Sequence, residues 1–298
     1  MKILVTGAAG WLARELVKTL EPAHELRLLD RVEPQAATVF APGQAERQAL
    51  PLETTWPYVR AEITDLDALR RACEGMDAVI HLAAATNGRP EQGISIMQAN
   101  VIGTYAVLDA ARLSGVRRVL CASSINAFGT IYFRISKRPV VYPSMPLTEA
   151  FPPEPEDPYS LSKYCNEETC AAFTRAYGLT TAAFRFAGVW TNEMYRGAQG
   201  KLPPTTGWSD ELYQWVHVND IAAGLRKAIE CPTLPEFGVY TLGAADTRCP
   251  EATMELLWQF QPSLAKNLTE PLPGRSALLS ISRAKHVFGY DPQHRLGV

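Results

Sequence analysis

The sequence lacks several features that mark specialised classes of protein. No uncharged apolar run approaches the ~20 residues that a transmembrane helix needs. The 29 basic and 31 acidic residues leave a net charge of −2, so the charge balance indicates neither nucleic acid nor an anionic membrane as a partner. The chain has no internal repeat and no low-complexity tail. What remains is the composition of a soluble globular protein, 47% hydrophobic and 20% charged.

Cysteine and histidine are also sparse, and their spacing is uninformative. The six cysteines form no CxxC pair, and neither they nor the five histidines show the spacing of metal ligands. We therefore expect reduced thiols, a cytoplasmic protein and no bound metal. The start of the chain, Lys2 followed by apolar residues, superficially resembles a signal peptide. Arg14 and Glu15 argue against that interpretation because they continue an amphipathic helix.

The first twenty residues hold the most informative pattern in the chain. Lys2–Thr6 is a short apolar run that predicts a buried strand, and an amphipathic helix follows through Leu20. Gly7 and Gly10 lie in the turn between them, where one would allow a sharp bend and the other a close approach of backbone to pyrophosphate. Ala13 takes the third place, which needs only a small residue. Strand, glycine-rich turn and helix together predict a dinucleotide-binding site.

Asp30 strengthens this interpretation. It ends a second apolar strand and stands twenty residues after Gly10. An acid at this place hydrogen-bonds an adenosine ribose 2′-hydroxyl and repels a 2′-phosphate, so the sequence favours NAD over NADP. Arg31 directly follows and is the one residue that speaks for NADP.

Strands then alternate with helices along most of the chain. The alternation predicts an α/β fold, a Rossmann-type doubly wound parallel sheet. The stretch 31–57 is long for a connection in such a sheet, and a short helix over 44–50 is expected within it. The further strands expected are Tyr58–Ile63, Asp77–Leu82, Val116–Ala122, Thr180–Phe186 and Val239–Leu242, and the clearest helices are 94–113, 158–177, 218–230 and 250–260.

From Ala187 the alternation breaks down. Within residues 187–216, the stretch 189–207 is rich in Gly, Pro and Thr and is expected to be a loop on the substrate side, and residues 246–298 read as helices and loops. We expect these two segments to form a small mixed substrate-binding region. Residues 1–186 and 217–245 would then form the cofactor-binding domain.

A candidate catalytic pair lies on the helix that begins at Pro158. Tyr159 and Lys163 are four residues apart, so they share a helix face. A phenol normally has a pKa near ~10, and a neighbouring ammonium lowers it toward the working pH. Tyr159 could then take the proton of a substrate hydroxyl. Ser124 ends a predicted strand, where open α/β sheets bind ligands, and could hold the same oxygen.

These motifs stand in an order that resembles the extended short-chain dehydrogenase/reductase family, the NAD-dependent epimerase/dehydratase group. The resemblance covers nearly the whole chain. The matching residues are Thr6–Ala13, Asp30, Glu62–Asp65, His81–Ala84, Asn100, Gly103–Thr104, Ser123–Ser124, Phe128–Gly129, Tyr159–Lys163, Arg185 and Trp215–Asp220.

The resemblance implies roles for particular residues. Ser124, Tyr159 and Lys163 would be catalytic, with Lys163 also bonding the nicotinamide ribose, and Asn100 would anchor the neighbouring loop or the cofactor. His81 and His217 would be structural, and the protein would be a homodimer through helices 94–113 and 158–177. The residues implied at the NAD site are Gly7, Gly10, Trp11, Leu12, Asp30, Arg31, Glu62, Ile63, Leu82, Ala83, Ala84, Asn100, Tyr159, Lys163 and Phe186.

The reaction is open at this point. Epimerases of the family that hold nucleotide-sugars usually carry Asn three residues after the strand-end Arg, whereas this chain has Gly188, and only a short segment then reaches Trp215. We therefore expect an NAD-dependent dehydrogenase acting on a hydroxyl of a sugar, sugar acid or polyol. The alternatives are a nucleotide-sugar epimerase or dehydratase with tightly bound NAD, and a non-catalytic NAD-binding sensor. The intact Ser124, Tyr159 and Lys163 argue against the sensor.

Overall fold

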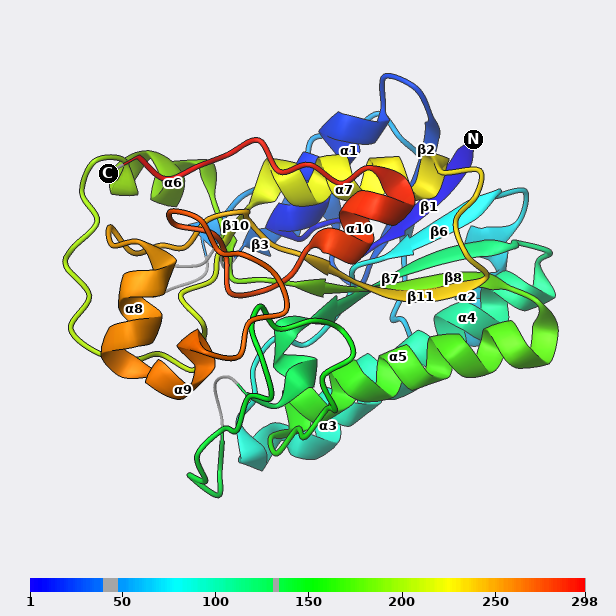
Figure 1. Cartoon of the computed structure of the whole chain (residues 1–298). Coiled ribbons are helices and arrows are strands. Elements are labelled where there is room, and N and C mark those ends of the chain that lie inside the picture. Colours follow the sequence, from blue (N-terminus) through cyan, green and yellow to red (C-terminus); the bar gives the residue numbers. More distant parts are fainter. Residues whose placement is uncertain (40–47, 131–133, 298) are drawn as a thin grey trace.

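The computed structural model describes residues 1–39, 48–130 and 134–297 (Figure 1). Its centre is a seven-stranded parallel sheet with strand order β11-β8-β7-β6-β1-β2-β5. Strand β1 lies inside the sheet, with β2 and β5 on one side and the later strands on the other, so the strand order reverses between β1 and β6, as in a dinucleotide-binding sheet. The strands are β1 (Lys2–Thr6), β2 (Glu25–Asp30), β5 (Tyr58–Arg60), β6 (Ala78–His81), β7 (Arg118–Ser124), β8 (Thr180–Phe186) and β11 (Phe237–Leu242).

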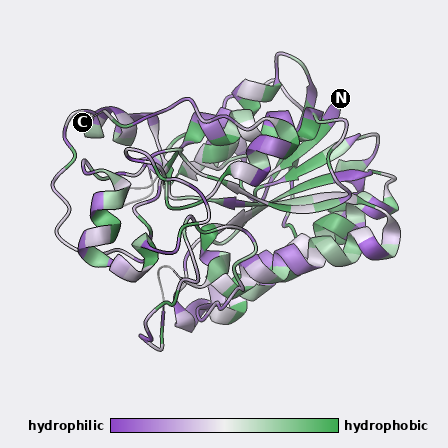
Figure 2. Ribbon diagram, in the orientation of Figure 1, coloured by the Kyte–Doolittle hydropathy of each residue, from purple (hydrophilic) through white to green (hydrophobic). Residues whose placement is uncertain are grey.

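Both faces of the sheet are buried, which explains why its strands read as continuous apolar runs. Along β1, Ile3 and Val5 point into one hydrophobic cluster, and Leu4 between them points into another on the opposite face. All three side chains are fully buried. Figure 2 accordingly shows the strands as mainly hydrophobic and the outer helices as mixed.

Helices cover each face of the sheet (Figure 1). On one face lie α1 (Trp11–Leu20) and α7 (Val218–Glu230), which pack against each other. On the other face lie α2 (Leu66–Cys73), α4 (Gly103–Leu113) and α5 (Pro158–Tyr177). The predicted doubly wound α/β fold is therefore confirmed. Among the described residues no helix is both long and apolar enough to cross a bilayer.

The helix caps follow from local sequence. Asp157 accepts hydrogen bonds from the backbone N–H groups of Tyr159 and Ser160 at 2.9 and 3.0 Å, and Pro158 takes the first helical position of α5. Gly178 ends α5 in the left-handed conformation with φ 69°. The N-cap fixes where the helix with the candidate catalytic pair begins, and Gly178 fixes where it ends.

The structure differs from the sequence-based expectation in two connections. The helix expected over 94–113 is divided into α3 (Gly93–Met97), a π-helical turn η3 (Gln98–Ile102) and α4. The helix expected over 44–50 lies partly outside the described residues, and its described end contains strand β4 (Gln48–Ala49), which pairs antiparallel with β3 (Thr38–Val39). The pattern of alternating side chains is too short there to distinguish the two structures.

A second group of elements lies beyond the carboxyl ends of the strands. We call residues 187–216 and 246–297 the peripheral region. It contains β9 (Val189–Trp190), α6 (Asn192–Ala198), α8 (Thr253–Phe260), α9 (Pro262–Ala265) and α10 (Ser282–Phe288). Strand β10 (Val216–His217) lies at its boundary, directly before α7. Short 3₁₀ turns complete the chain at η1 (Pro34–Ala36), η2 (Pro90–Gln92) and η4 (Ile125–Phe128). In Figure 1 helices α6, α8 and α9 stand apart from the sheet.

Candidate active site

One cavity of about 620 Å³ opens at the carboxyl ends of the sheet strands. The residues that follow or end β1, β2, β5, β6, β7 and β8 line it, as expected for the ligand crevice of an open α/β sheet. All the site residues predicted from the sequence except Asn100 contribute to this lining. They are Gly7, Gly10, Trp11, Leu12, Asp30, Arg31, Glu62, Ile63, Leu82, Ala83, Ala84, Ser124, Tyr159, Lys163 and Phe186.

The glycine-rich turn is a backbone cradle. Gly7 has φ 74°, and a Cβ there would lie 2.6 Å from the backbone nitrogen of Ala83. Gly10 is the N-cap of α1 and offers no side chain to its first N–H groups. Trp11 and Leu12, the first two helical residues, line the cavity. Free N–H groups at a helix N-terminus suit a phosphate group, so this cradle fits the pyrophosphate of a dinucleotide.

Asp30 is held by backbone donors on both of its carboxylate oxygens. Oδ2 accepts from the N–H of Ala9 at 3.1 Å, and Oδ1 accepts from the N–H of Val32 at 3.3 Å. These bonds fix an acceptor group at the wall of the cavity, in keeping with a ribose hydroxyl as its ligand. Arg31 is exposed beside it at the rim.

Three residues of the 31–57 stretch besides Arg31 also line the cavity, and sequence reasoning missed them. Val32, Thr38 and Val39 stand on the same side as Asp30. Arg14 of α1 helps to hold this stretch, because its guanidinium donates to the carbonyl oxygens of Ala9 at 3.1 Å and Pro51 at 2.9 Å. No motif in the sequence marks such a wall, since its position depends on a side chain that comes from another element.

Asn100 is fully buried in the π-helical turn. Its side chain accepts from the N–H of Ala85 at 2.7 Å and donates to the Ala85 carbonyl at 2.9 Å and to Ser162 Oγ at 2.8 Å. Ala85 lines the cavity, so Asn100 anchors the loop after β6 to helix α5. π-helical turns occur frequently at functional sites, and the position of this one beside the cavity agrees with that tendency.

The candidate catalytic residues converge on the end of β7. Lys163 is buried, and its Nζ donates to the carbonyl oxygen of Ala122 at 2.9 Å. Nζ also lies 5.6 Å from the centre of the Tyr159 ring. Burial lowers the pKa of Lys163 to about 8. Ser124 Oγ accepts from the N–H of Asn126 at 3.2 Å, and the Tyr159, Lys163 and Ser124 side chains line the same cavity.

The two histidines near the site have structural environments. His81 lies between the hydroxyls of Thr6 at 2.7 Å and Thr104 at 3.2 Å, and burial lowers its pKa to about 3. His217 caps α7 by accepting from the N–H of Asn219 at 3.2 Å, and it stacks on His294 with ring centres 3.5 Å apart. Burial also lowers the pKa of His217 to about 4, so the imidazoles of His81 and His217 are neutral near pH 7.

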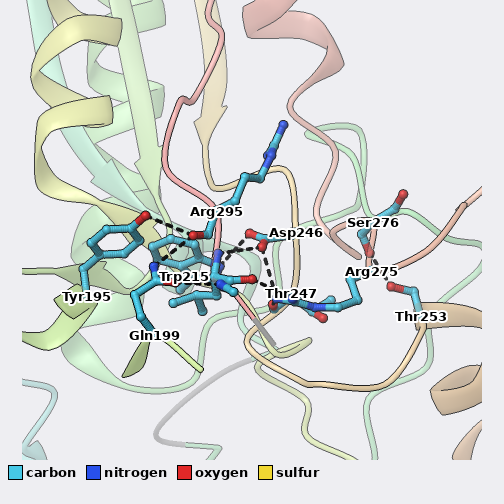
Figure 3. Close-up of polar contacts among 11 residues, drawn as sticks. Tyr195, Gln199, Trp215, Asp246, Thr247, Thr253, Arg275, Ser276 and Arg295 are labelled. Carbon is cyan, nitrogen blue, oxygen red and sulfur yellow. Dashed lines mark hydrogen bonds and ion pairs between the residues drawn. The ribbon is translucent and has the colours of Figure 1, made fainter. Parts of the chain in front are cut away.

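The peripheral region is held by a network of side chains (Figure 3). The buried carboxylate of Asp246 accepts from Trp215 Nε1 at 3.0 Å, from Arg275 at 3.1 Å and from the N–H of Leu296 at 3.0 Å. Arg275 also donates to the carbonyl of Leu296 at 2.6 Å. Tyr195 of α6 donates to the carbonyl of Arg295 at 3.0 Å. We call these residues the Asp246 network.

The peripheral region borders the cavity through Ala187 and Val189. Between them, the N–H of Gly188 donates to the side-chain oxygen of Gln214. A Cβ at position 188 would lie 3.3 Å from that amide. The Gln214 side chain therefore fills the space that a larger residue at 188 would need. The loop expected over 189–207 is wrong in one respect, because it contains helix α6.

Comparison with known proteins shows that the chain is similar to sugar-processing enzymes. The chain is 27% identical to a uronate dehydrogenase from Pseudomonas syringae pv. tomato over 249 residues, which is 83% of this chain and 75% of that one. An L-arabinose 1-dehydrogenase (NAD(P)(+)) from Haloferax volcanii is 27% identical over 83% of this chain and 90% of its own. A UDP-glucose 4-epimerase from Corynebacterium glutamicum is 22% identical over 99% of this chain and 92% of its own.

Solved structures share the fold. A short-chain dehydrogenase/reductase superfamily protein from Agrobacterium tumefaciens, solved with bound NAD, superposes with a TM-score of 0.69 at 22% identity, covering 99% of this chain and 93% of that one. The model of the NAD dependent epimerase/dehydratase family matches residues 3–243, which cover the whole sheet except its first residue, Lys2. NAD is thus the cofactor, as the sequence predicted. The chain belongs to the NAD-dependent epimerase/dehydratase family, an extended short-chain dehydrogenase/reductase group.

Proposed function

We propose that this protein is an NAD-dependent dehydrogenase that oxidises a hydroxyl group of a small polar substrate, a sugar, sugar acid or polyol. One observation carries the proposal. Ser124, Tyr159 and Lys163 line the same cavity as the glycine-rich turn and Asp30, so proton acceptor and cofactor cradle face one space.

Each of these site residues has a definite task in the proposed reaction. Tyr159 takes the proton of the substrate hydroxyl, and the ammonium of Lys163 favours the phenolate that does so. Ser124 donates to the substrate oxygen and stabilises the charge that develops there. Bound NAD supplies the hydride acceptor. The N–H groups at the start of α1 hold its pyrophosphate, and Asp30 holds its adenosine ribose.

The space beyond Ser124 supports a small substrate rather than a nucleotide-sugar. Gly188 carries no side chain, and the Gln214 amide occupies the adjacent volume. Only residues 189–214 are available at this place to grip a diphosphate, and their cations are Arg196 and Lys201. The sugar dehydrogenases among the relatives act on substrates of the proposed size.

The test is the absorbance of NADH when the protein is mixed with NAD and a panel of sugars, sugar acids, polyols and nucleotide-sugars. We expect a rise with one class of free sugar, sugar acid or polyol, and its loss in Tyr159→Phe. Absence of NADH formation with every such substrate, together with epimerisation or dehydration of a nucleotide-sugar, would refute the proposal.

A nucleotide-sugar epimerase or dehydratase is the second candidate. The similarity to a UDP-glucose 4-epimerase over 99% of this chain favours it. Such an enzyme returns the hydride to its substrate and retains its cofactor. Protein purified without added cofactor should then carry stoichiometric NAD, whereas a dehydrogenase must release NADH in each cycle.

We also propose a homodimer. The segment 94–113, in α3, η3 and α4, packs beside α5, and both carry exposed apolar residues. Exposed apolar residues that gather on one face are typical of protein interfaces. Light scattering at micromolar concentration should give twice the monomer mass, and a monomer would refute this assembly. The exposed residues are Ile94, Ile102, Tyr105, Leu113, Leu161 and Tyr177.

A further inference from the structure

Helix α5 carries a third charged residue on its catalytic face. Glu167 follows Lys163 by four residues, as Lys163 follows Tyr159, so the three side chains share one face of the helix. This face packs against β7 and β8. Glu167 is 2% exposed, and glutamate is almost never so deeply buried unless it is paired.

The partners of Glu167 join the ends of the two strands. Arg185 of β8 binds it in a bidentate manner, with Nε 2.9 Å from Oε1 and Nη2 2.8 Å from Oε2. Ser123 of β7 donates its hydroxyl to Oε1 at 2.6 Å. Ser123 and Arg185 are direct neighbours in the register of the sheet. One carboxylate therefore links α5 to both strands at a single level.

These bonds surround the groups that we propose as catalytic. Ser123 directly precedes Ser124, and Ala122 before it accepts the bond from Lys163. Two successive residues of β7 are thus fastened to α5, one by Lys163 and the next by Glu167. The spacing between Ser124 on the strand and Tyr159 on the helix depends on both bonds.

Stability alone does not explain a charged pair in this place. Taking two charges out of water is costly, and apolar residues of similar volume would stabilise the fold as well or better. Arg185 Nη1 is buried without a hydrogen-bond partner among the described residues, which adds to the cost. Its guanidinium lies 4.2 Å from the centre of the Phe128 ring, a contact that offsets part of it.

We propose that Glu167 is a positioning residue for the dehydrogenase reaction: it fixes Ser124 relative to Tyr159 through Ser123, and it places a negative charge one helical turn from Lys163. This inference rests on the proposed function. A carboxylate one helical turn from a buried ammonium makes loss of the ammonium proton less favourable. Arg185 takes up part of that charge and thereby limits the effect.

The surroundings of Lys163 agree with this assignment. Burial lowers its pKa, while Cys121 of β7 and Glu167 act in the opposite direction. The other ionisable groups around it are Tyr159 on its own helix and His81 on β6, which is neutral. Glu167 is the carboxylate on the helix face that Lys163 shares, so its removal should change the titration of Lys163.

The test uses the full-length protein with Glu167→Gln, which keeps the shape of the side chain and removes its charge. We expect kcat to fall at least tenfold at pH 7, with the Kd for NAD within about twofold of its starting value. In the pH profile of kcat/KM, the basic limb is the fall at high pH, which we expect near pH 8 as Lys163 loses its proton. In Glu167→Gln this limb should move about one pH unit lower. Glu167→Asp retains the charge and should keep the limb near its original position.

Two comparisons separate positioning from a purely structural role. Asp246→Asn also removes a buried, paired carboxylate but lies in the peripheral region, so it should leave the limb unchanged. Glu167→Leu with Arg185→Leu removes both charges and should retain the fold. Wild-type kcat and an unmoved limb in that double variant would show that the pair acts only structurally and would overturn the proposal.

A readout without turnover distinguishes failure of this inference from failure of the proposed function. The Nζ of Lys163 can be titrated by ¹⁵N NMR after assignment with Lys163→Arg. We expect its midpoint near pH 8 in the original protein and lower in Glu167→Gln. An unchanged midpoint contradicts the inference even if the protein oxidises no sugar, whereas a shifted midpoint without any dehydrogenase activity contradicts only the proposed function.

Discussion

The two walls of the cavity are built in different ways. The sheet side uses the backbone: a glycine with φ 74° after β1, the open N-terminus of α1 and the carboxyl ends of strands. The peripheral region uses side chains, with Asp246 receiving bonds from Trp215, Arg275 and the backbone of Leu296. Backbone cradles leave a short local pattern in the sequence, whereas a network between distant residues leaves none.

The largest effect is expected where the two regions meet. Tyr159→Phe removes the proton acceptor and should lower kcat by about 10²–10⁴-fold, because general base catalysis contributes roughly that much. The Kd for NAD should stay the same, since the ring remains in the cavity wall. Stopped-flow measurement of NADH formation and equilibrium titration with NAD check this. Tyr164→Phe, a phenol of the same helix, is the matched control and should retain full activity.

The next largest effect is expected from a substitution in the glycine-rich turn that forms the backbone cradle. Gly7→Ala combines a positive φ, costing about 1–2 kcal/mol, with a Cβ 2.6 Å from the nitrogen of Ala83. We expect a Kd for NAD at least tenfold higher and a lower free energy of unfolding. Gly115→Ala has the same sign of φ but no atom within 4 Å of its Cβ, so it should affect stability alone. Equal NAD affinity in both variants would contradict the cradle.

A substitution in the Asp246 network should affect stability and substrate binding, whereas a substitution in the glycine-rich turn affects NAD binding. Asp246→Asn leaves Arg275 without its charged partner and should reduce the free energy of unfolding by roughly 3 kcal/mol. The KM for the substrate should rise while the Kd for NAD changes little. Urea denaturation and substrate kinetics measure the two effects. Glu25→Gln, in an exposed pair with Lys2, is the control and should cost less than about 1 kcal/mol.

The smallest expected effect concerns the choice between NAD and NADP. Asp30→Asn removes a negative charge that repels a 2′-phosphate, a repulsion of about 1 kcal/mol at the solvent-exposed rim. The ratio of kcat/KM with NADP to that with NAD should therefore rise about fivefold. An unchanged ratio would assign the choice to the wall formed by Val32, Thr38 and Val39.

The features that could be predicted from the sequence are the local backbone patterns, and those that could not are the contacts between distant residues. The strand and helix around Gly7 and Gly10 were predicted correctly because periodicity and turn chemistry act over a few residues. The π turn at Asn100 and the wall at Val39 were not predicted, since each depends on bonds to residues far along the chain. Glu167 could have been found, because it continues the spacing of Tyr159 and Lys163. The proposed roles at the site remain predictions until they are measured.

The chain order of the Asp246 network bears on how the protein forms during synthesis. The last strand of the sheet ends at Leu242, but Asp246 binds Leu296, which is 50 residues further along. At about 5–20 residues per second, that separation is roughly 2–10 s of translation. The nascent chain therefore holds all the strands of the sheet before the later part of the peripheral region, residues 246–297, can dock. A dinucleotide that binds this early form would stabilise it against unfolding while the rest of the protein is still being made.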